Sequence, residues 1–234
     1  MLVVISVGGS ILAKDLDSDR FISYANALSA LAKKHRLVIV TGGGVAARDY
    51  INVARSVGAN EVACDFIGIE VTRLNAHLLI SALGNNAFPE PPRTYKEAEA
   101  ALTSGKIVVM GGVIPGQTTD AVSAILAEYL GADLMVIATS VDGVYTADPT
   151  TNPDAVKFEK MTAKELVNIV MSIEMKAGSK SPVDPLAAKI IERCHIETIV
   201  MDGNDPIAVS EVIMQEGVES ESVTGVHFGT RIIG

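Results

Sequence analysis

Three glycine-rich turns are the part of this sequence best suited to chemistry. They read Gly-Gly-Ser at residues 8–10, Gly-Gly-Gly at 42–44 and Gly-Gly at 111–112, the last followed by Pro-Gly-Gln-Thr-Thr-Asp at 115–120. Glycine lets the backbone come close to a phosphate, and N–H groups at a helix N-terminus donate hydrogen bonds to it. The pattern therefore predicts a site that holds several phosphates with backbone groups.

The charge of the chain limits how phosphate can be bound. The 234 residues include 19 Lys and Arg against 28 Asp and Glu, for a formal net charge of −9. Such a balance argues against nucleic acid or an anionic membrane as a partner. Backbone N–H groups explain how an acidic protein could still hold phosphates. The 2 cysteines and 4 histidines lack metal-ligand spacing, so we expect no metal site built from them.

Short apolar runs alternate with helical patterns, and these elements must position the turns. The predicted strands are residues 3–7, 37–41, 107–110, 134–139 and 198–201. The predicted helices are residues 21–34, 45–57, 71–83, 119–130 and 186–194, the last capped by Asp184 before Pro185. Thr162 and Glu165 have the spacing of a capping box before another helix. Strands that are apolar throughout are covered on both faces, which predicts a three-layer α/β/α sandwich around a central, mainly parallel sheet.

Each glycine turn follows a predicted strand, and in an open α/β sheet ligands bind at the carboxyl ends of the strands. We therefore expect the three turns to meet at one edge. Asp120, expected to cap the helix at 119–130, is the candidate to organise this edge and to orient cationic groups. Arg48 lies one turn into the helix that follows residues 42–44.

The length of the chain favours one domain with two lobes. Its hydropathy pattern favours a cytoplasmic protein. Hydrophobic residues make up 48% of the chain, but the apolar stretch 121–141 is interrupted by Glu128 and Asp133. We therefore expect no run long enough to span a bilayer. Residues 1–5 lack the basic lead-in of a signal peptide.

Two common nucleotide motifs also match parts of the turns. Gly42-x-Gly44-x-x-Ala47, with Asp65 about twenty residues on, satisfies a dinucleotide fingerprint, although that motif usually follows the first strand. Residues 111–118 have P-loop spacing, but Gln117 stands where the phosphate-binding lysine belongs, so we reject a P-loop.

Taken together, the motifs resemble the amino acid kinase family. That family combines an opening strand ending in Gly-Gly-Ser, a Gly-Gly-Gly turn, and a later Thr-x-Val-Asp-Gly-Val-Tyr-x-x-Asp-Pro pattern, which is present here at residues 139–149. Within the family, four further segments are similar to archaeal UMP kinases: residues 42–48, 65–69, 115–121 and 184–191. The resemblance covers essentially the whole chain.

The resemblance implies transfer of a phosphoryl group from ATP to UMP with Mg²⁺, in a homohexamer built from dimers. It implies an N-terminal lobe, about residues 1–130, that binds UMP, and a C-terminal lobe, about residues 131–234, that binds ATP. The implied ATP-binding residues are Gly9, Ser10, Gly44, Arg48, Thr139, Ser140, Tyr145 and Asp148. The implied UMP-binding residues are Gly43, Asp65 at the ribose, Val113, Ile114, Pro115, Gly116, Gln117, Thr118 and Thr119. The catalytic candidates are Asp120, Arg48 and Ser10.

One position departs from the family pattern. Many members carry a lysine two residues before the first glycine of Gly-Gly-Ser, facing the transferring phosphate, and here that residue is Ser6. The positive charge of the family's lysine would be supplied here by magnesium, by Arg48, or by a lysine of the segment 176–180. A phosphate acceptor is already an anionic nucleophile, so the reaction needs no general base.

Four other functions stay open. An isopentenyl phosphate kinase has a similar pattern but usually carries a histidine in the helix after Gly-Gly-Gly, and residues 45–50 contain none. Acetylglutamate and aspartate kinases need a carboxylate clamp that the sequence does not show. A non-catalytic nucleotide- or oxyanion-binding protein is supported only by Ser6, and an NAD-dependent oxidoreductase only by the fingerprint at Gly42.

Overall fold

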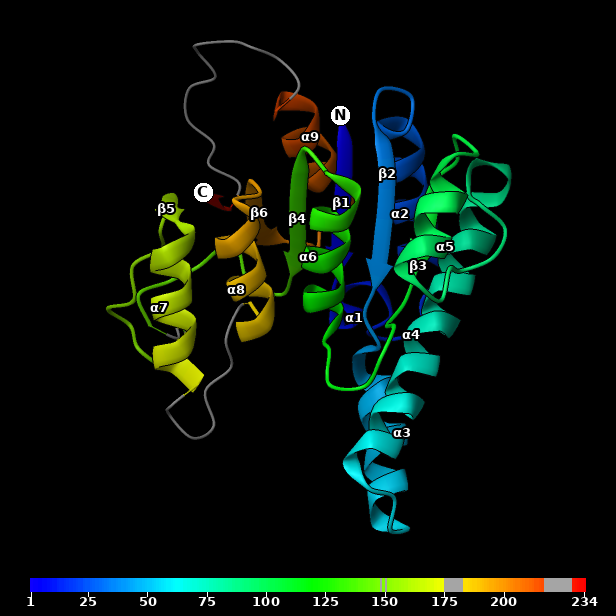
Figure 1. Ribbon diagram of the computed structural model, residues 1–234, viewed down its shortest axis with the longest axis horizontal. Coiled ribbons are helices and arrows are strands. Elements are labelled where there is room, and N and C mark those ends of the chain that lie inside the picture. The colour runs from blue at the N-terminus through cyan, green and yellow to red at the C-terminus, as the bar shows by residue number, and fades with distance from the viewer. Residues whose placement is uncertain (148, 150, 175–182, 217–228) are drawn as a thin grey trace.

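The computed structural model of the protein describes residues 1–147, 149, 151–174, 183–216 and 229–234. Within them, one sheet has the strand order β3-β2-β1-β4-β6-β7-β5 (Figure 1). The strands are β1 (Leu2–Val7), β2 (Arg36–Thr41), β3 (Val108–Met110), β4 (Leu134–Thr139), β5 (Lys160–Thr162), β6 (Thr198–Asp202) and β7 (Thr230–Ile233). Neighbouring strands pair in parallel except β6 and β7, which confirms a mainly parallel sheet.

Helices cover both faces of this sheet and enclose two separate cores. One face packs against α1 (Gly9–Leu12), α2 (Ser18–Leu31), α4 (Glu61–Leu83) and α9 (Pro206–Glu216). The other packs against α5 (Tyr95–Leu102), α6 (Thr119–Leu130), α7 (Ala163–Glu174) and α8 (Pro185–Cys194). Successive residues of β1 alternate between the cores, Val4 in one and Val3 and Ile5 in the other. The three-layer sandwich predicted from the sequence is confirmed.

Two helices extend past the sheet. α3 (Gly44–Ser56) packs along α4, and together they project beyond the rest of the molecule (Figure 1). A short 3₁₀ turn, η1 (Gly84–Asn86), follows α4. Gly68, in the middle of α4, lies against Ile51 of α3, where a Cβ would come within 3.0 Å of the isoleucine side chain. Glycine here serves close helix packing.

The sequence placed most elements correctly and one long helix wrongly. We expected a helix to begin at residue 71, but α4 begins at Glu61 behind Asn60, whose side chain accepts a hydrogen bond from the Ala63 N–H. The expected caps of α7 and α8 are confirmed, by the reciprocal bonds of Thr162 with Glu165 and by Asp184. The sequence did not predict α1, α5, α9, β5 or β7.

The expectation that no stretch is long enough to span a bilayer was wrong for α4. The segment Glu61–Asn86 is long and apolar enough by length and composition alone. Half of its apolar window is buried within the protein, where α4 packs against α2 and α3. Such burial is typical of the core helix of a globular domain.

Candidate active site

The first two glycine turns lie in direct backbone contact at the carboxyl ends of β1 and β2. A Cβ on Gly9 would lie 2.0 Å from the Gly44 nitrogen and 2.6 Å from the carbonyl carbons of Gly42 and Gly43. Gly44 has a φ of +67°, a conformation that glycine adopts without steric cost. The turn after β1 therefore fits against the start of α3 only because side chains are absent.

The third turn is held against α4. A Cβ on Gly111 would lie 2.4 Å from Oγ1 of Thr72, and this hydroxyl accepts a hydrogen bond from the Gly112 N–H at 2.7 Å. Asn75, also on α4, donates to the Gly42 carbonyl oxygen at 2.8 Å. Thus α4 ties the second turn to the third. We expected these glycines mainly to admit phosphate, and at Gly111 the structure adds a packing role.

Two side chains fix the segment between β3 and α6. Asp65 on α4 accepts a hydrogen bond from the Gly116 N–H at 2.8 Å, and Gly116 has a φ of +79°. Tyr95 of α5 donates from its hydroxyl to Oε1 of Gln117 at 2.9 Å. Burial raises the pKa of Tyr95 to about 12, so this hydroxyl keeps its proton at neutral pH. The Gln117 amide is left with its NH₂ group for a ligand.

Asp120 does not cap its helix. The N-cap of α6 is Thr118, whose side chain accepts from the Ala121 N–H, so the expectation for Asp120 was wrong. The half-buried Asp120 side chain instead accepts a hydrogen bond from the Ser6 hydroxyl at 2.7 Å. Burial raises the pKa of Asp120 from 3.8 to about 6, the bond from Ser6 lowers it, and Asp184 raises it. Among the described residues, no cation pairs with this carboxylate.

Two catalytic candidates remain accessible beside these turns. Arg48 is exposed on α3 and makes no hydrogen bond or ion pair with the residues that the structure describes. Ser10 lies half-buried in the single turn of α1, next to the contact between Gly9 and Gly44. Both are therefore free to meet a ligand.

The far half of the edge, after β4, is built from side chains in a loop. Asp142 accepts hydrogen bonds from the Tyr145 hydroxyl at 2.7 Å and from Lys157 Nζ at 3.1 Å. Partial burial raises the pKa of Asp142, but these two bonds outweigh it and the net shift is downward. Thr139 is half-buried and Ser140 exposed at the end of β4. Asp148 and the lysines of residues 176–180 lie outside the described residues.

The structure therefore brings the predicted residues together unevenly. It gathers most of them where β1, β2 and β3 end; they are Gly9, Ser10, Gly43, Gly44, Arg48, Asp65, Gly116, Gln117, Thr118 and Asp120. Val113, Ile114, Pro115 and Thr119 lie in the same segment before or at the start of α6. Sequence reasoning missed Thr72, Asn75 and Tyr95, because polar residues within helical patterns carry no signal for the turns they will face.

This geometry suits the binding of phosphate groups. Backbone groups of the touching turns provide hydrogen-bond donors without side-chain cations. A half-buried carboxylate without a described counter-charge favours a cation arriving with the ligand. In-line transfer between two bound phosphates requires this kind of alignment and charge compensation.

Comparisons with known proteins agree with this geometry. The model of the amino acid kinase family matches residues 1–202. The chain is 74% identical over its full length to the full length of a uridylate kinase from Methanococcoides burtonii. It is 65% identical over 224 residues, 96% of each chain, to a uridylate kinase from Methanosarcina mazei. The crystal structure of uridylate kinase from Archaeoglobus fulgidus superposes with a TM-score of 0.87 at 42% identity, covering 99% of this chain and 100% of that one.

Proposed function

This chain belongs to the amino acid kinase family, and we propose that it transfers the γ-phosphoryl group of ATP to UMP, giving ADP and UDP. The observation that carries the proposal is the backbone contact of Gly9 with residues 42–44. This contact supports the proposal, because the turn that would hold the ATP phosphates touches the turn that would hold the UMP phosphate. The match to uridylate kinases over the whole chain supports the choice of acceptor.

The acceptor is assigned to the half of the edge formed by β2, β3 and α4. Gly43 and residues 113–119 would hold the UMP phosphate, and Asp65 would accept hydrogen bonds from the ribose hydroxyls. The bond from Gly116 to Asp65 already places this carboxylate beside the segment. Because Gln117 is oriented by Tyr95, its amide NH₂ could donate to the bound nucleotide.

The donor nucleoside is assigned to the half of the edge that follows β4, and the donor phosphates to residues that follow β1 and β2. Gly9, Ser10, Gly44 and Arg48 would approach the ATP phosphates, and Thr139, Ser140, Tyr145 and Asp148 would line the nucleoside pocket. The exposed Arg48 supports this role, since it has no partner among the described residues. The two-lobe division near residue 130 belongs to the same proposal.

Phosphoryl transfer here needs alignment and charge compensation more than proton transfer. UMP supplies an anionic oxygen, so no residue must act as a base. Mg²⁺ bound with ATP would neutralise charge on its phosphates. Asp120, half-buried without a described cation, fits the role of orienting the positive groups around those phosphates. Ser6 holds its carboxylate in place by the hydrogen bond.

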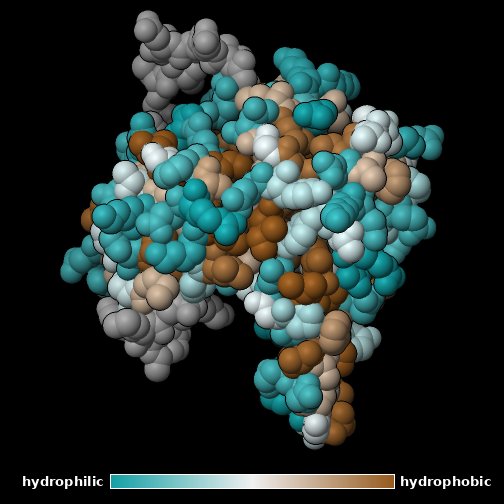
Figure 2. Space-filling model, viewed as in Figure 1, coloured by the Kyte–Doolittle hydropathy of each residue, from teal (hydrophilic) through white to brown (hydrophobic). Residues whose placement is uncertain are grey.

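The proposal includes a cytoplasmic homohexamer that serves pyrimidine nucleotide synthesis. Apolar side chains are exposed among polar ones on the projecting α3–α4 pair (Figure 2); they include Tyr50, Val53, Val57, Val62 and Phe66. Apolar patches of this kind usually mark contacts between proteins. Light scattering should give the mass of six chains, and a monomeric mass would contradict this part of the proposal.

A coupled ADP-release assay with ATP and Mg²⁺ tests the activity. The acceptors are UMP, CMP, AMP, isopentenyl phosphate and acetylglutamate. We expect rapid turnover with UMP and much slower turnover with the others. Turnover with isopentenyl phosphate instead would assign the chain to a different kinase of the same fold. ATP binding without turnover on any acceptor would favour a non-catalytic protein.

A further inference from the structure

A pocket lies at the end of the sheet opposite the glycine turns. Its volume is about 440 Å³, and it opens where β1 and β2 begin and where α2 ends. In Figure 1 this end carries the N label, while α1 and the loop before α6 lie at the other end. A ligand here would therefore not compete with one bound at the glycine turns.

The lining of this pocket is cationic in an otherwise acidic protein. Lys33, Lys34, His35 and Arg36 follow one another in the sequence and all line it. The two lysines and the arginine are exposed and form no ion pair within the described part of the chain. Lys33 and Lys34 also lie near the C-terminal end of α2, whose dipole favours positive charge. The helix dipole explains why basic residues occur at this end of α2, but it gives their charged groups no hydrogen-bond partner.

The His35 side chain lies among these cationic residues and has one unpaired ring nitrogen. Its Nδ1 atom is buried and has no hydrogen-bond partner in the described structure. A buried polar atom of this kind costs free energy unless something bonds to it. Burial, then the Met1 amino group and Lys34, lower the pKa of the imidazole, which favours the neutral ring in the free protein. Lys106, near the turn after α5, lines a small cavity on another side of the ring, together with Arg36.

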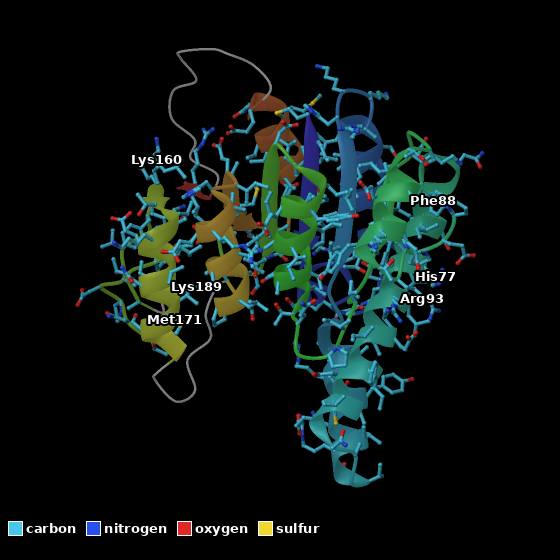
Figure 3. All side chains as sticks on the ribbon, viewed as in Figure 1. His77, Phe88, Arg93, Lys160, Met171 and Lys189 are labelled. Atoms are coloured by element: carbon cyan, nitrogen blue, oxygen red, sulfur yellow. The ribbon has the colours of Figure 1, made fainter. Side chains whose placement is uncertain are left out.

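Counter-charge is scarce in this pocket. Asp133 is the carboxylate among its lining residues, and Oδ2 of Asp133 already accepts a hydrogen bond from the Leu2 N–H at 2.6 Å. A second cationic cavity differs in this respect: it is about 100 Å³ and contains His77 and Arg93 (Figure 3). There Glu70 and Glu90 share the lining, and Glu70 pairs with Arg73 at 2.5 Å. The pocket at the start of β1 and β2 therefore has one carboxylate, already hydrogen-bonded, against four basic side chains.

We propose that this pocket binds a polyphosphate anion, with phosphate oxygens contacting Lys33, Lys34 and Arg36 next to the His35 ring, whose protonated form the anion stabilises. Charge-assisted hydrogen bonds to phosphate are among the strong polar contacts in proteins. The volume suits more than a single phosphate group. Inorganic polyphosphate and the phosphate chain of a nucleotide share this chemistry, and the site needs no kinase activity.

Histidine NMR on the full chain tests the assignment. The His35 signal is identified by its loss in His35→Gln, and its pKa is measured with and without tripolyphosphate at matched ionic strength. We expect the anion to raise the pKa of His35 by about one unit, which means about tenfold tighter binding to the protonated protein. His77 and His195 should not shift. A parallel titration with ATP separates the two sources of phosphate.

Charge-neutral variants make the test specific. In the double variant Lys33→Gln/Lys34→Gln, the rise in the His35 pKa should fall to less than half. Lys96→Gln, which removes an exposed lysine of α5 outside the pocket, should leave the rise unchanged. The proposal is overturned if tripolyphosphate changes the pKa of His35 no more than that of His77. It is also overturned if the pKa of His35 rises equally in wild type and in the double variant. A shift with ATP but none with tripolyphosphate would also contradict it.

Discussion

The two halves of the candidate active site are built differently. In the acceptor half, helix α4 bonds to the turns after β2 and β3, through Asn75 to Gly42, Thr72 to Gly112 and Asp65 to Gly116. In the donor half, the described contacts join side chains of an exposed loop, where Asp142 accepts hydrogen bonds from both Tyr145 and Lys157. One half is held by bonds from helix side chains to the backbone of the turns, and the other by bonds between surface side chains.

This difference has consequences for binding. A pre-formed site loses little conformational entropy when its ligand arrives, whereas surface side chains must be ordered by the ligand. Exposed ion pairs such as the one between Asp142 and Lys157 contribute little by themselves. We therefore expect substitutions at the α4 bonds to act strongly and selectively, and substitutions in the loop around Asp142 to act weakly.

The largest effect should come from Gly9→Ala. The added Cβ would clash with backbone atoms of residues 42–44, which no side-chain movement can relieve. We expect the free energy of unfolding to fall by about 3 kcal/mol and activity to be lost. Gly8→Ala is the matched control, since its Cβ would approach its nearest neighbour, the Ala138 oxygen, only to 3.4 Å. Equal denaturant midpoints for the two variants would show that the turns are not in close contact.

Asp120→Asn should lower kcat by about a hundredfold, the size usual for losing one preorganised electrostatic group. It should also change how stability depends on pH. The folded pKa of about 6 lies above the unfolded value of 3.8, so ionisation of Asp120 costs stability as pH rises through this range. From pH 4 to pH 8, the unfolding free energy of the variant should gain up to about 3 kcal/mol relative to wild type. If the difference in unfolding free energy between the variant and wild type is the same at pH 4 and pH 8, the Asp120 carboxylate is not buried without a partner.

Asp65→Asn tests the acceptor half alone. Loss of a charged acceptor should raise KM for UMP by about ten- to a hundredfold, because hydrogen bonds to charged groups are worth about 1.5–3 kcal/mol. KM for ATP should stay within about twofold of wild type, if the two halves act separately. An equal rise in both constants would show that Asp65 supports the fold of the site rather than the ribose.

The smallest effect should come from Tyr95→Phe, which removes the hydroxyl that orients Gln117. We expect KM for UMP to rise about threefold to tenfold with kcat nearly unchanged, the cost of one neutral hydrogen bond. Tyr129→Phe is the control, since its hydroxyl bonds to Glu99 on the surface, away from the turns. If both variants behave alike, Tyr95 has no positioning role.

Local patterns in the sequence were enough to predict the sheet, most helices and the edge where the turns gather. They worked because β1, β2 and β4 are mostly apolar, and a glycine turn directly follows β1 and β2. The strands β5 and β7 are short and only partly buried, so their residues give no such pattern. The start of α4 was missed because the helix is apolar on most sides and contains Gly68.

The site was less predictable where it depends on contacts between distant residues. Ser6 and Asp120 are 114 positions apart, and nothing in either segment indicates that their side chains meet. Thr118, Thr119 and Asp120 can all cap a helix, so local rules cannot choose among them. Only the packing of α6 on β1 turns Asp120 inward and leaves Thr118 as the cap.

Calorimetric titration of UMP, with and without a non-hydrolysable ATP analogue, tests the division of the site most directly. The account predicts one UMP per chain in both titrations, with weaker UMP binding only in Asp65→Asn and weaker analogue binding only in Tyr145→Phe. Displacement of UMP by the analogue, or weakening of the same ligand by both variants, would show that donor and acceptor do not occupy separate halves of the edge.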